Sequence, residues 1–167
     1  MICLTTNRLV LKPLQVSDMT RLVTLIGTPE VVNNLSQVPF PYTLKDAEEW
    51  LAVVSGEKFN LSIFLDDALI GAVALSNNHD GSYELGYWLG SEYWGCGYAT
   101  EAAAGLLEFA AAQISPLKVS ANVFQENYAS ANVLKKLGFN ATGKGEVFSV
   151  SRQARVAAFT YALCTKV

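Results

Sequence analysis

Alternating and helical patterns of apolar residues divide the chain into a succession of strands and helices. The first strand-like run, residues 7–14, alternates well enough to predict an opening strand. Three central runs rich in apolar and aromatic residues are separated by short turn sequences, which predicts an antiparallel meander. The predicted strands are residues 7–14, 59–65, 69–75, 83–89, 117–124, 139–150 and 156–165.

Capping residues and helical periodicity predict the segments between these strands. Ser17 and Thr43 are good N-cap residues, and Asp46 follows Thr43 at the spacing of a capping-box variant. Pro29 stands where proline commonly opens a helix, and Gly56 suits the left-handed position that ends one. The predicted helices are about 18–27, a short helix from Pro29, then 43–56, 99–113 and about 128–137.

The order of these elements predicts an α+β fold. The helix over 99–113 connects the strands 83–89 and 117–124, so those two strands should be adjacent and parallel. Because the central meander is antiparallel, we expect a sheet with mixed strand directions. With 167 residues and no linker-like stretch, the chain is expected to form one domain, 1–167.

Composition narrows the class of protein. The chain is 51% apolar and 16% charged, which excludes a disordered chain. A net charge of −3 argues against a general nucleic-acid binder. Cys3, Cys96 and Cys164 are widely spaced, so neither a disulfide framework nor a thiolate metal site is expected. No apolar run approaches the ~20 residues of a membrane span. We expect a cytoplasmic protein without a metal, a membrane partner or a nucleic-acid partner.

The strongest chemical signal is the segment WGCGYATEA at residues 94–102, which follows a strand and opens a long helix. A helix N-terminus offers free backbone N–H groups and a positive dipole end. Gly95 and Gly97 let the backbone approach a ligand closely. The segment therefore predicts a phosphate or pyrophosphate site, although a tight turn that needs two glycines has the same pattern. Thr100 stands where a dinucleotide fingerprint requires its third glycine.

A second motif, NYASANVLKKLGF at 127–139, lies some thirty residues downstream. Together with YELGYWL at 83–89, the glycine segment and the opening TNRLVLKPLQVSD, it resembles the GNAT acetyltransferases. Within them it is most similar to the RimJ/RimL-type branch of ribosomal-protein N-terminal acetyltransferases. The resemblance implies the GNAT fold, a central mixed, mostly antiparallel sheet of about seven strands flanked by about four helices, with a splayed pair of parallel strands. It also implies acetyl-CoA as co-substrate, with no metal.

The resemblance carries over to particular residues. It implies that backbone amides of the glycine segment hold the CoA pyrophosphate. The pantetheine arm would run along the strand 83–89, where an amide N–H polarises the thioester carbonyl. The implied cofactor-binding residues are Trp88, Leu89, Gly95, Cys96, Gly97, Tyr98, Ala99, Thr100, Asn127 and Ser130.

Two residues carry the implied catalysis. Glu84 matches the acidic position of the family and would act as general base through a water molecule; alternatively it is an exposed strand residue paired across the hairpin. Ser130 would protonate the leaving thiolate. A purely structural alternative is that Asn127 caps the helix and Ser130 occupies its first turn.

The sequence also departs from the family pattern. Trp94 and Cys96 stand where many members carry polar or basic side chains, so the loop is expected to bring no cation of its own. Backbone amides would then hold the anion with little help from lysine or arginine. Lys135 and Lys136 either reach the 3′-phosphate or are simply solvated. Leu134 stands where many members have a general-acid tyrosine.

These observations lead to one main functional hypothesis. The chain transfers acetyl from acetyl-CoA to a primary amine, on either a protein N-terminus or a small molecule, by direct attack. The alternative is a catalytically idle CoA-binding or protein-interaction domain on the same fold. The protein would be a monomer or a homodimer.

Overall fold

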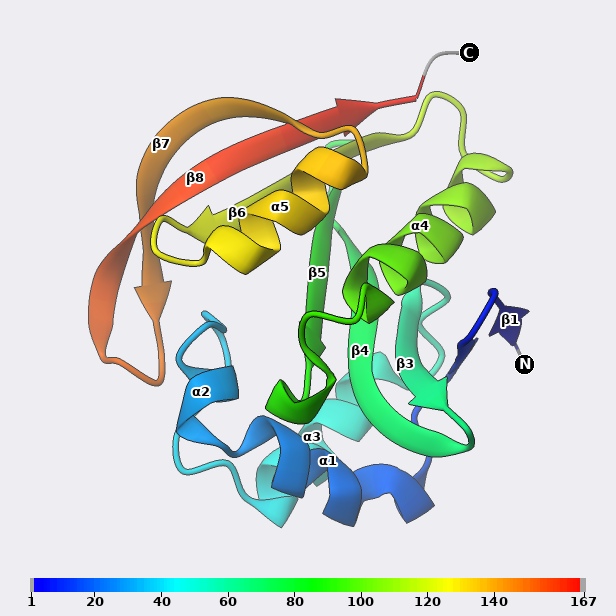
Figure 1. The fold of residues 1–167 in the computed structure, drawn as a ribbon, viewed down its shortest axis with the longest axis vertical. Coiled ribbons are helices and arrows are strands. Elements are labelled where there is room, and N and C mark those ends of the chain that lie inside the picture. The colour runs from blue at the N-terminus through cyan, green and yellow to red at the C-terminus, as the bar shows by residue number, and fades with distance from the viewer. Residues whose placement is uncertain (1, 166–167) are drawn as a thin grey trace.

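The computed structural model describes residues 2–165 and contains a central eight-stranded sheet (Figure 1). The strand order is β1-β2-β3-β4-β5-β6-β8-β7, and every neighbouring pair is antiparallel except β5 and β6. The strands are β1 Leu4–Thr5, β2 Val10–Lys12, β3 Asn60–Leu65, β4 Ala68–Asn77, β5 Tyr83–Leu89, β6 Lys118–Phe124, β7 Asn140–Ser149 and β8 Ala154–Cys164. The expected α+β fold is confirmed.

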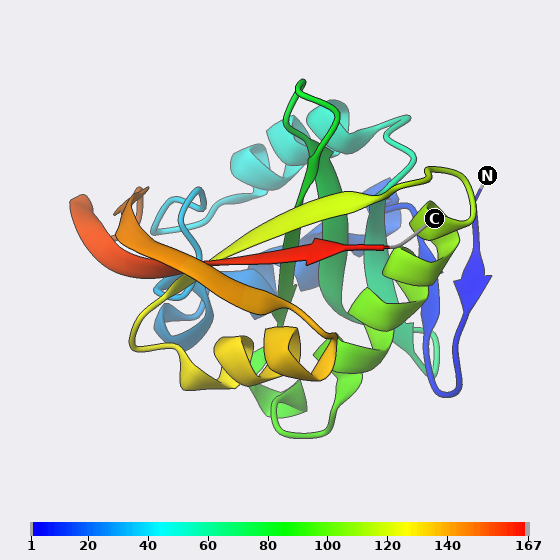
Figure 2. The ribbon, with the colours of Figure 1, turned by 90° about the horizontal axis from the view of Figure 1, so that it is seen from above.

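Helices cover both faces of the sheet (Figure 2). On one face, α4 and α5 bury apolar residues in the larger core, together with residues of the central strands. On the other face, α1 and α3 enclose a smaller core that includes Phe64 and Leu69. In the described residues, no helix is long and apolar enough to cross a membrane. The helices are α1 Met19–Ile26, α2 Pro29–Val32, α3 Leu44–Val54, α4 Tyr98–Ala111 and α5 Tyr128–Lys136.

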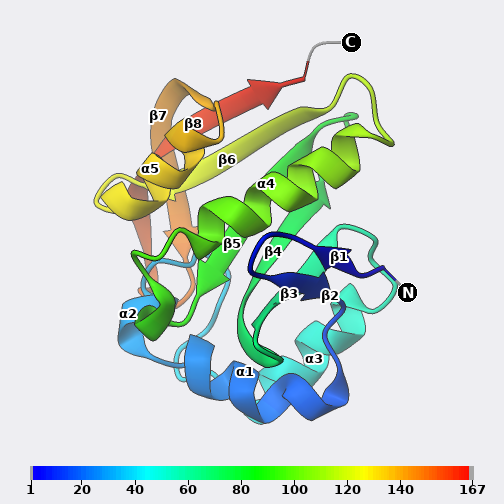
Figure 3. The same ribbon diagram turned by 45° about the vertical axis from the view of Figure 1, so that its right-hand side comes forward.

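The parallel pair β5–β6 separates after a very short contact. Only Tyr83 and Glu84 of β5 pair with β6, whereas β5 pairs with β4 along its whole length to Leu89. Figure 3 shows the two strands diverging beside the N-terminal end of α4. The expected adjacent, parallel and splayed strands are therefore confirmed, and the gap between them positions the site described below.

Local sequence signals account for several helix ends. The Thr43 amide donates to the Asp46 carboxylate at 2.7 Å, and the Asp46 amide donates back to the Thr43 hydroxyl at 3.3 Å, which completes the predicted capping box. Gly56 has the predicted left-handed conformation, with φ of 89°. The predicted Ser17 cap is wrong, because a 3-10 turn over Val16–Asp18 precedes α1 and closes through Gln15 and Asp18 instead.

The opening segment also differs from the prediction. The single strand expected over 7–14 is instead a turn followed by β2, which pairs with the earlier β1 in a hairpin; the Thr6 amide closes the turn by donating to the Leu9 carbonyl at 2.9 Å. This turn accounts for the eighth strand. It also places Arg8 at the tip of a hairpin instead of inside a strand, and this position becomes important at the site.

Candidate active site

A cleft of about 590 Å³ lies where β5 and β6 diverge. Its walls come from distant parts of the chain. Strand β5 contributes residues 84–89, β6 contributes 121–124, and α5 contributes residues along most of its length, from Ala129 to Lys136. The start of α4 closes one end, and the segment after α2, residues 34–37, lines another part. The cleft thus joins the two sequence motifs to a region that neither motif includes.

The glycine segment forms one end of the cleft. Gly95 and Gly97 have positive φ angles of 73° and 81°, a conformation that L side chains rarely adopt. The first backbone hydrogen bond of α4 runs from the Glu101 amide to the Gly97 carbonyl at 3.0 Å. The amides of the preceding three residues therefore have no partner within the helix. These residues, which all line the cleft, are Tyr98, Ala99 and Thr100.

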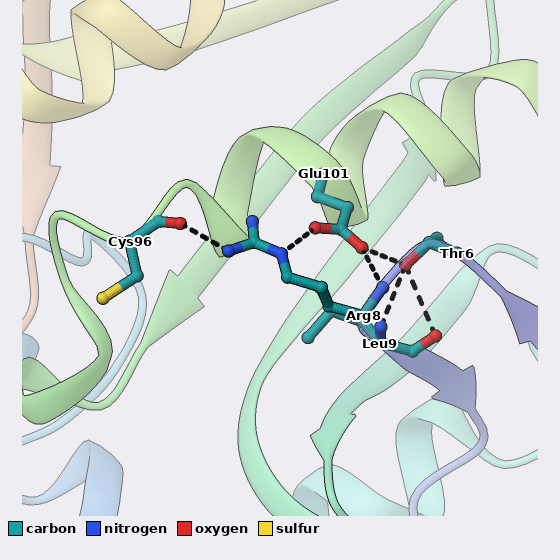
Figure 4. Close-up of polar contacts among 5 residues, drawn as sticks. All are labelled: Thr6, Arg8, Leu9, Cys96 and Glu101. Carbon is teal, nitrogen blue, oxygen red and sulfur yellow. Dashed lines mark hydrogen bonds and ion pairs between the residues drawn. The ribbon is translucent and has the colours of Figure 1, made fainter.

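Cys96 is placed differently from its neighbours. It does not line the cleft, although Gly95 and Gly97 on either side of it do. Its exposed thiol lies 3.6 Å from the Trp94 carbonyl. Its own carbonyl accepts a hydrogen bond from the Arg8 guanidinium at 3.0 Å (Figure 4). The structure thus separates Cys96 from the neighbouring glycines that line the cleft.

Strand β5 presents backbone groups to the gap. The Gly90 amide donates to the Ile70 carbonyl of β4 at 2.9 Å. Backbone N–H and C=O groups alternate in direction along a strand, so those of Tyr87 and Leu89 point away from β4, toward the gap beyond the short contact with β6. The Leu89 carbonyl accepts from the Trp94 indole N–H at 2.9 Å. Trp88 lines the cleft, but its side chain packs against the smaller core and its backbone faces β4. The Tyr87 and Leu89 amides are thus the strand donors that face the gap.

Glu84 lies at the point where the strands separate. Its Oε1 atom accepts a hydrogen bond of 3.1 Å from the Asn122 side-chain amide on β6. The Asn122 oxygen in turn accepts a 3.1 Å hydrogen bond from the Thr160 hydroxyl on β8. These two linked hydrogen bonds hold the Glu84 carboxylate from the side of β6. Sequence reasoning missed Asn122 and Thr160, since only the pairing of β6 with β5 and β8 brings them to Glu84.

Ser130 meets a partner that the sequence motif did not indicate. Its hydroxyl lies 2.8 Å from the hydroxyl of Tyr87, which also donates to the Ser130 carbonyl at 2.9 Å. Burial raises the pKa of Tyr87 to about 12, so the phenol remains a hydrogen-bond donor at neutral pH. Asn127 caps α5 by accepting from the Ser130 amide at 3.1 Å, as the structural alternative predicted.

Glu84 and Tyr87 occupy opposite faces of β5. Side chains alternate along a strand, so residues separated by three positions point to different faces. Tyr87 packs against the larger core beside α5, whereas Glu84 shares the face of Trp88 and the smaller core. A group held between β5 and β6 would therefore have a carboxylate on one side and a hydroxyl pair on the other.

A further wall is held by hydrogen bonds between distant segments. The Val150 amide donates to the Ser36 carbonyl at 2.8 Å. The Arg152 guanidinium donates to the Asn33 carbonyl at 2.7 and 3.0 Å and pairs with Glu126. These bonds fasten the segment after α2 to the turn between β7 and β8. No motif in the sequence marks this wall.

The charges of the cleft are few. Among the described lining residues, the ionisable acid is Glu84 and the cation is Lys136; Lys135 is not part of the lining. The described residues contain no group of three or more side chains placed to hold a metal ion. The loop has no cation of its own, as expected, but Arg8 reaches it from the β1–β2 hairpin. Sequence reasoning missed this residue.

Comparisons with known sequences identify the family. The family described as acetyltransferase (GNAT) domain matches residues 8–140. The chain is 26% identical over 147 residues to the uncharacterized N-acetyltransferase p20 of Bacillus licheniformis, covering 83% of this chain and 82% of that protein. It is 27% identical over 144 residues to the uncharacterized N-acetyltransferase YnaD of Bacillus subtilis, covering 84% of each.

Solved structures share the fold at lower identity. A GNAT-family acetyltransferase from Bacillus anthracis superposes with a TM-score of 0.86 at 20% identity, over 98% of both chains. The ribosomal-protein acetyltransferase RimL in complex with coenzyme A gives 0.81 at 15% identity, over 98% of both chains. The ribosomal-protein-S5-alanine acetyltransferase of Vibrio fischeri gives 0.77 at 16% identity, over 98% of this chain and 97% of that one. With a family match over most of its length, the chain belongs to the GNAT acetyltransferases.

Proposed function

We propose that this protein transfers the acetyl group of acetyl-CoA to a primary amine, on a protein N-terminus or on a small molecule. The observation that carries the proposal is the arrangement of one cleft. It has unpaired helix amides at one end, a gap between parallel strands in the middle, and a single carboxylate, Glu84, beside that gap. We further propose that residues 1–167 act as one domain.

The cofactor would bind along the loop and the splayed strands. The amides of Tyr98, Ala99 and Thr100, with the positive end of the α4 dipole, form an anion site suited to a pyrophosphate. Nothing lies within 4 Å of the position that a Cβ would take at Gly95, which leaves room for a close ligand. That RimL has been solved in complex with coenzyme A supports this assignment on a shared fold.

The acetyl transfer requires an uncharged amine. The amine nitrogen attacks the thioester carbonyl carbon, forming the C–N bond as the C–S bond breaks. Glu84, held by Asn122, accepts the amine proton through a water molecule and releases it to solvent. A β5 amide facing the gap, from Tyr87 or Leu89, donates to the developing oxyanion.

The leaving thiolate needs a proton. Ser130 and Tyr87 form a hydroxyl pair on the face of β5 opposite to Glu84. In the proposed arrangement, Tyr87 turns its one hydrogen from the Ser130 carbonyl to the Ser130 hydroxyl oxygen, 2.8 Å away, so that the Ser130 hydrogen is free to point at the sulfur. Ser130 gives its proton to the thiolate and regains one from solvent through Tyr87. This pair takes the place of the tyrosine that many family members carry where this chain has Leu134.

An acceptor panel tests the proposal. Acetyl-CoA is mixed with the protein and with peptides of free N-terminus, polyamines or aminoglycoside-type amines, and thiol release is followed. Amine-dependent release with an acetylated product supports the proposed transfer. Tight binding of CoA without release for any amine would instead favour the idle CoA-binding domain. The same peptides with blocked N-termini provide the matched control.

A further inference from the structure

Arg8 contacts the glycine segment from a distant part of the chain (Figure 4). Its Nε atom donates to Glu101 at 2.7 Å, and its Nη1 atom donates to the Cys96 carbonyl at 3.0 Å. The guanidinium also lies 4.5 Å from the centre of the Tyr98 ring. One planar side chain thus joins the loop before α4 to the first turn of that helix.

Glu101 anchors the guanidinium to the hairpin. Its carboxylate accepts from the Arg8 amide at 2.7 Å and from the Thr6 hydroxyl at 2.6 Å, besides the bond from the Arg8 side chain. Its side chain is only 15% exposed. Burial acts to raise the pKa of Glu101, but the hydrogen bonds from Thr6 and Arg8 outweigh it and lower the pKa below its ordinary value. The Glu101 carboxyl is therefore ionised at neutral pH.

The bond to Cys96 determines where the next amide points. In a trans peptide, the carbonyl and the following N–H point in opposite directions. Fixing the Cys96 carbonyl toward Arg8 therefore aims the Gly97 N–H the other way. Gly97 lines the cleft and Cys96 does not, so this orientation directs the amide toward the cleft.

We propose that Arg8 is a positioning residue that sets the pyrophosphate-binding loop before the cofactor arrives. It acts through the Cys96–Gly97 peptide and is itself held by Glu101. The inference rests on the proposed function, because it assumes that the loop binds the CoA pyrophosphate. Fixing the loop in advance removes the ordering cost that binding would otherwise carry.

Arginine suits this position better than lysine. Its planar fork donates in two directions at once, here to the carboxylate of Glu101 and the carbonyl of Cys96. A lysine ammonium keeps the charge but cannot reproduce that fixed fork. Comparing arginine with lysine at position 8 therefore distinguishes a positioning role from a general attraction between a cation and a phosphate.

The test compares two probes, coenzyme A and pantetheine, which lacks the pyrophosphate. Binding of each is titrated with the wild-type protein and with the Arg8→Gln, Arg8→Lys and Arg155→Gln variants. Arg155 forms an exposed ion pair with Glu146 on the β7–β8 hairpin. Arg155→Gln therefore removes the same charge as Arg8→Gln but leaves the glycine segment unchanged. Melting temperatures establish that each variant is folded, and Glu101→Gln offers a second way to loosen the contact.

We expect Arg8→Gln and Arg8→Lys each to weaken CoA roughly tenfold, as for loss of a charge-assisted hydrogen bond. Glu101→Gln should weaken CoA in the same direction. Pantetheine binding and the Arg155→Gln variant should stay at the wild-type level. Wild-type CoA affinity in Arg8→Gln, in Arg8→Lys or in folded Glu101→Gln overturns the inference, as does an equal loss for both probes. A wild-type protein that binds no CoA overturns the proposed function as well, which distinguishes the two failures.

Discussion

Two parts of the cleft are built in different ways. The cofactor end uses residues close together in sequence, with glycines at positive φ and a helix N-terminus that follows directly. Another wall, formed by residues 34–37, is joined to the turn between β7 and β8 through bonds such as that from Val150 to Ser36. Local sequence thus forms the loop where we propose that the cofactor binds, whereas long-range contacts build the wall beside which we propose that the acceptor binds. A shared motif therefore indicates the cofactor more directly than the acceptor.

Replacing the Glu84 carboxylate should have the largest effect on turnover. We expect Glu84→Gln to lower kcat at neutral pH about 100-fold, because the amine loses its proton acceptor. CoA affinity should not change, since the side chain lies away from the loop. Steady-state thiol release and CoA titration measure the two quantities. Glu146→Gln, an exposed carboxylate on β7, is the control; equal turnover of Glu84→Gln and wild type would remove Glu84 as the base.

Distorting the glycine segment should weaken CoA binding, the property that Glu84→Gln should leave unchanged. Gly97 has φ of 81°, and an added Cβ would lie 3.4 Å from the Arg8 guanidinium. Gly97→Ala should weaken CoA binding roughly tenfold, from a strain of about 1–2 kcal/mol. Gly143→Ala is the matched control, because nothing lies within 4 Å of its Cβ position. Unchanged CoA titration in Gly97→Ala would show that the loop does not hold the cofactor.

Removing the phenol hydroxyl should affect turnover alone. Tyr87→Phe loses the hydrogen bond to Ser130, which should lower kcat roughly fivefold, the value of one ordinary hydrogen bond. Poor leaving groups should be affected more than good ones, so thioester analogues with thiols of different pKa provide the measurement. Tyr87→Phe with normal kcat for every leaving group contradicts the proposed relay.

Loosening the wall formed by residues 34–37 should weaken acceptor binding and leave CoA binding unchanged. Arg152→Gln removes the bonds to the Asn33 carbonyl and should raise the acceptor KM about threefold, for a loss near 0.5–1 kcal/mol. CoA affinity should remain normal. Kinetics at saturating acetyl-CoA measure the change, with Arg155→Gln as control. A weaker CoA complex with an unchanged acceptor KM would reverse the assignment of the two parts.

The smallest expected effect concerns stability and pH. Because the pKa of Glu101 is lowered in the folded protein, its ionised form favours folding above the ordinary carboxyl range. That contribution is lost as pH falls through the lowered folded-state pKa. Wild type should therefore exceed Glu101→Gln in melting temperature at neutral pH, with the gap closing in acid. A gap that widens on acidification would contradict the lowered pKa.

The sequence predicted those features that depend on neighbouring residues. The Thr43–Asp46 capping box, the Asn127 cap and the left-handed Gly56 all follow from local chemistry. The parallel pairing of β5 and β6 followed from the connecting helix. The roles of Glu84, Ser130 and the cofactor residues remain predictions that the experiments above address.

The missed features depend on contacts across long stretches of chain. Arg8 and Glu101 are 93 positions apart, and the opening turn that brings them together was hidden inside an apparently alternating run. Asn122 and Tyr87 sit in ordinary strands, where side-chain hydrogen bonds to Glu84 and Ser130 leave no periodic signal. Predicting them requires the pairing register of the sheet and the packing of α5 against it.

The most direct test of the central proposal is thiol release from acetyl-CoA in the presence of a panel of primary amines. We expect thiol release that depends on both the protein and an amine, yields an N-acetylated product and falls about 100-fold in Glu84→Gln. CoA that binds wild type without release from any amine in the panel would contradict it.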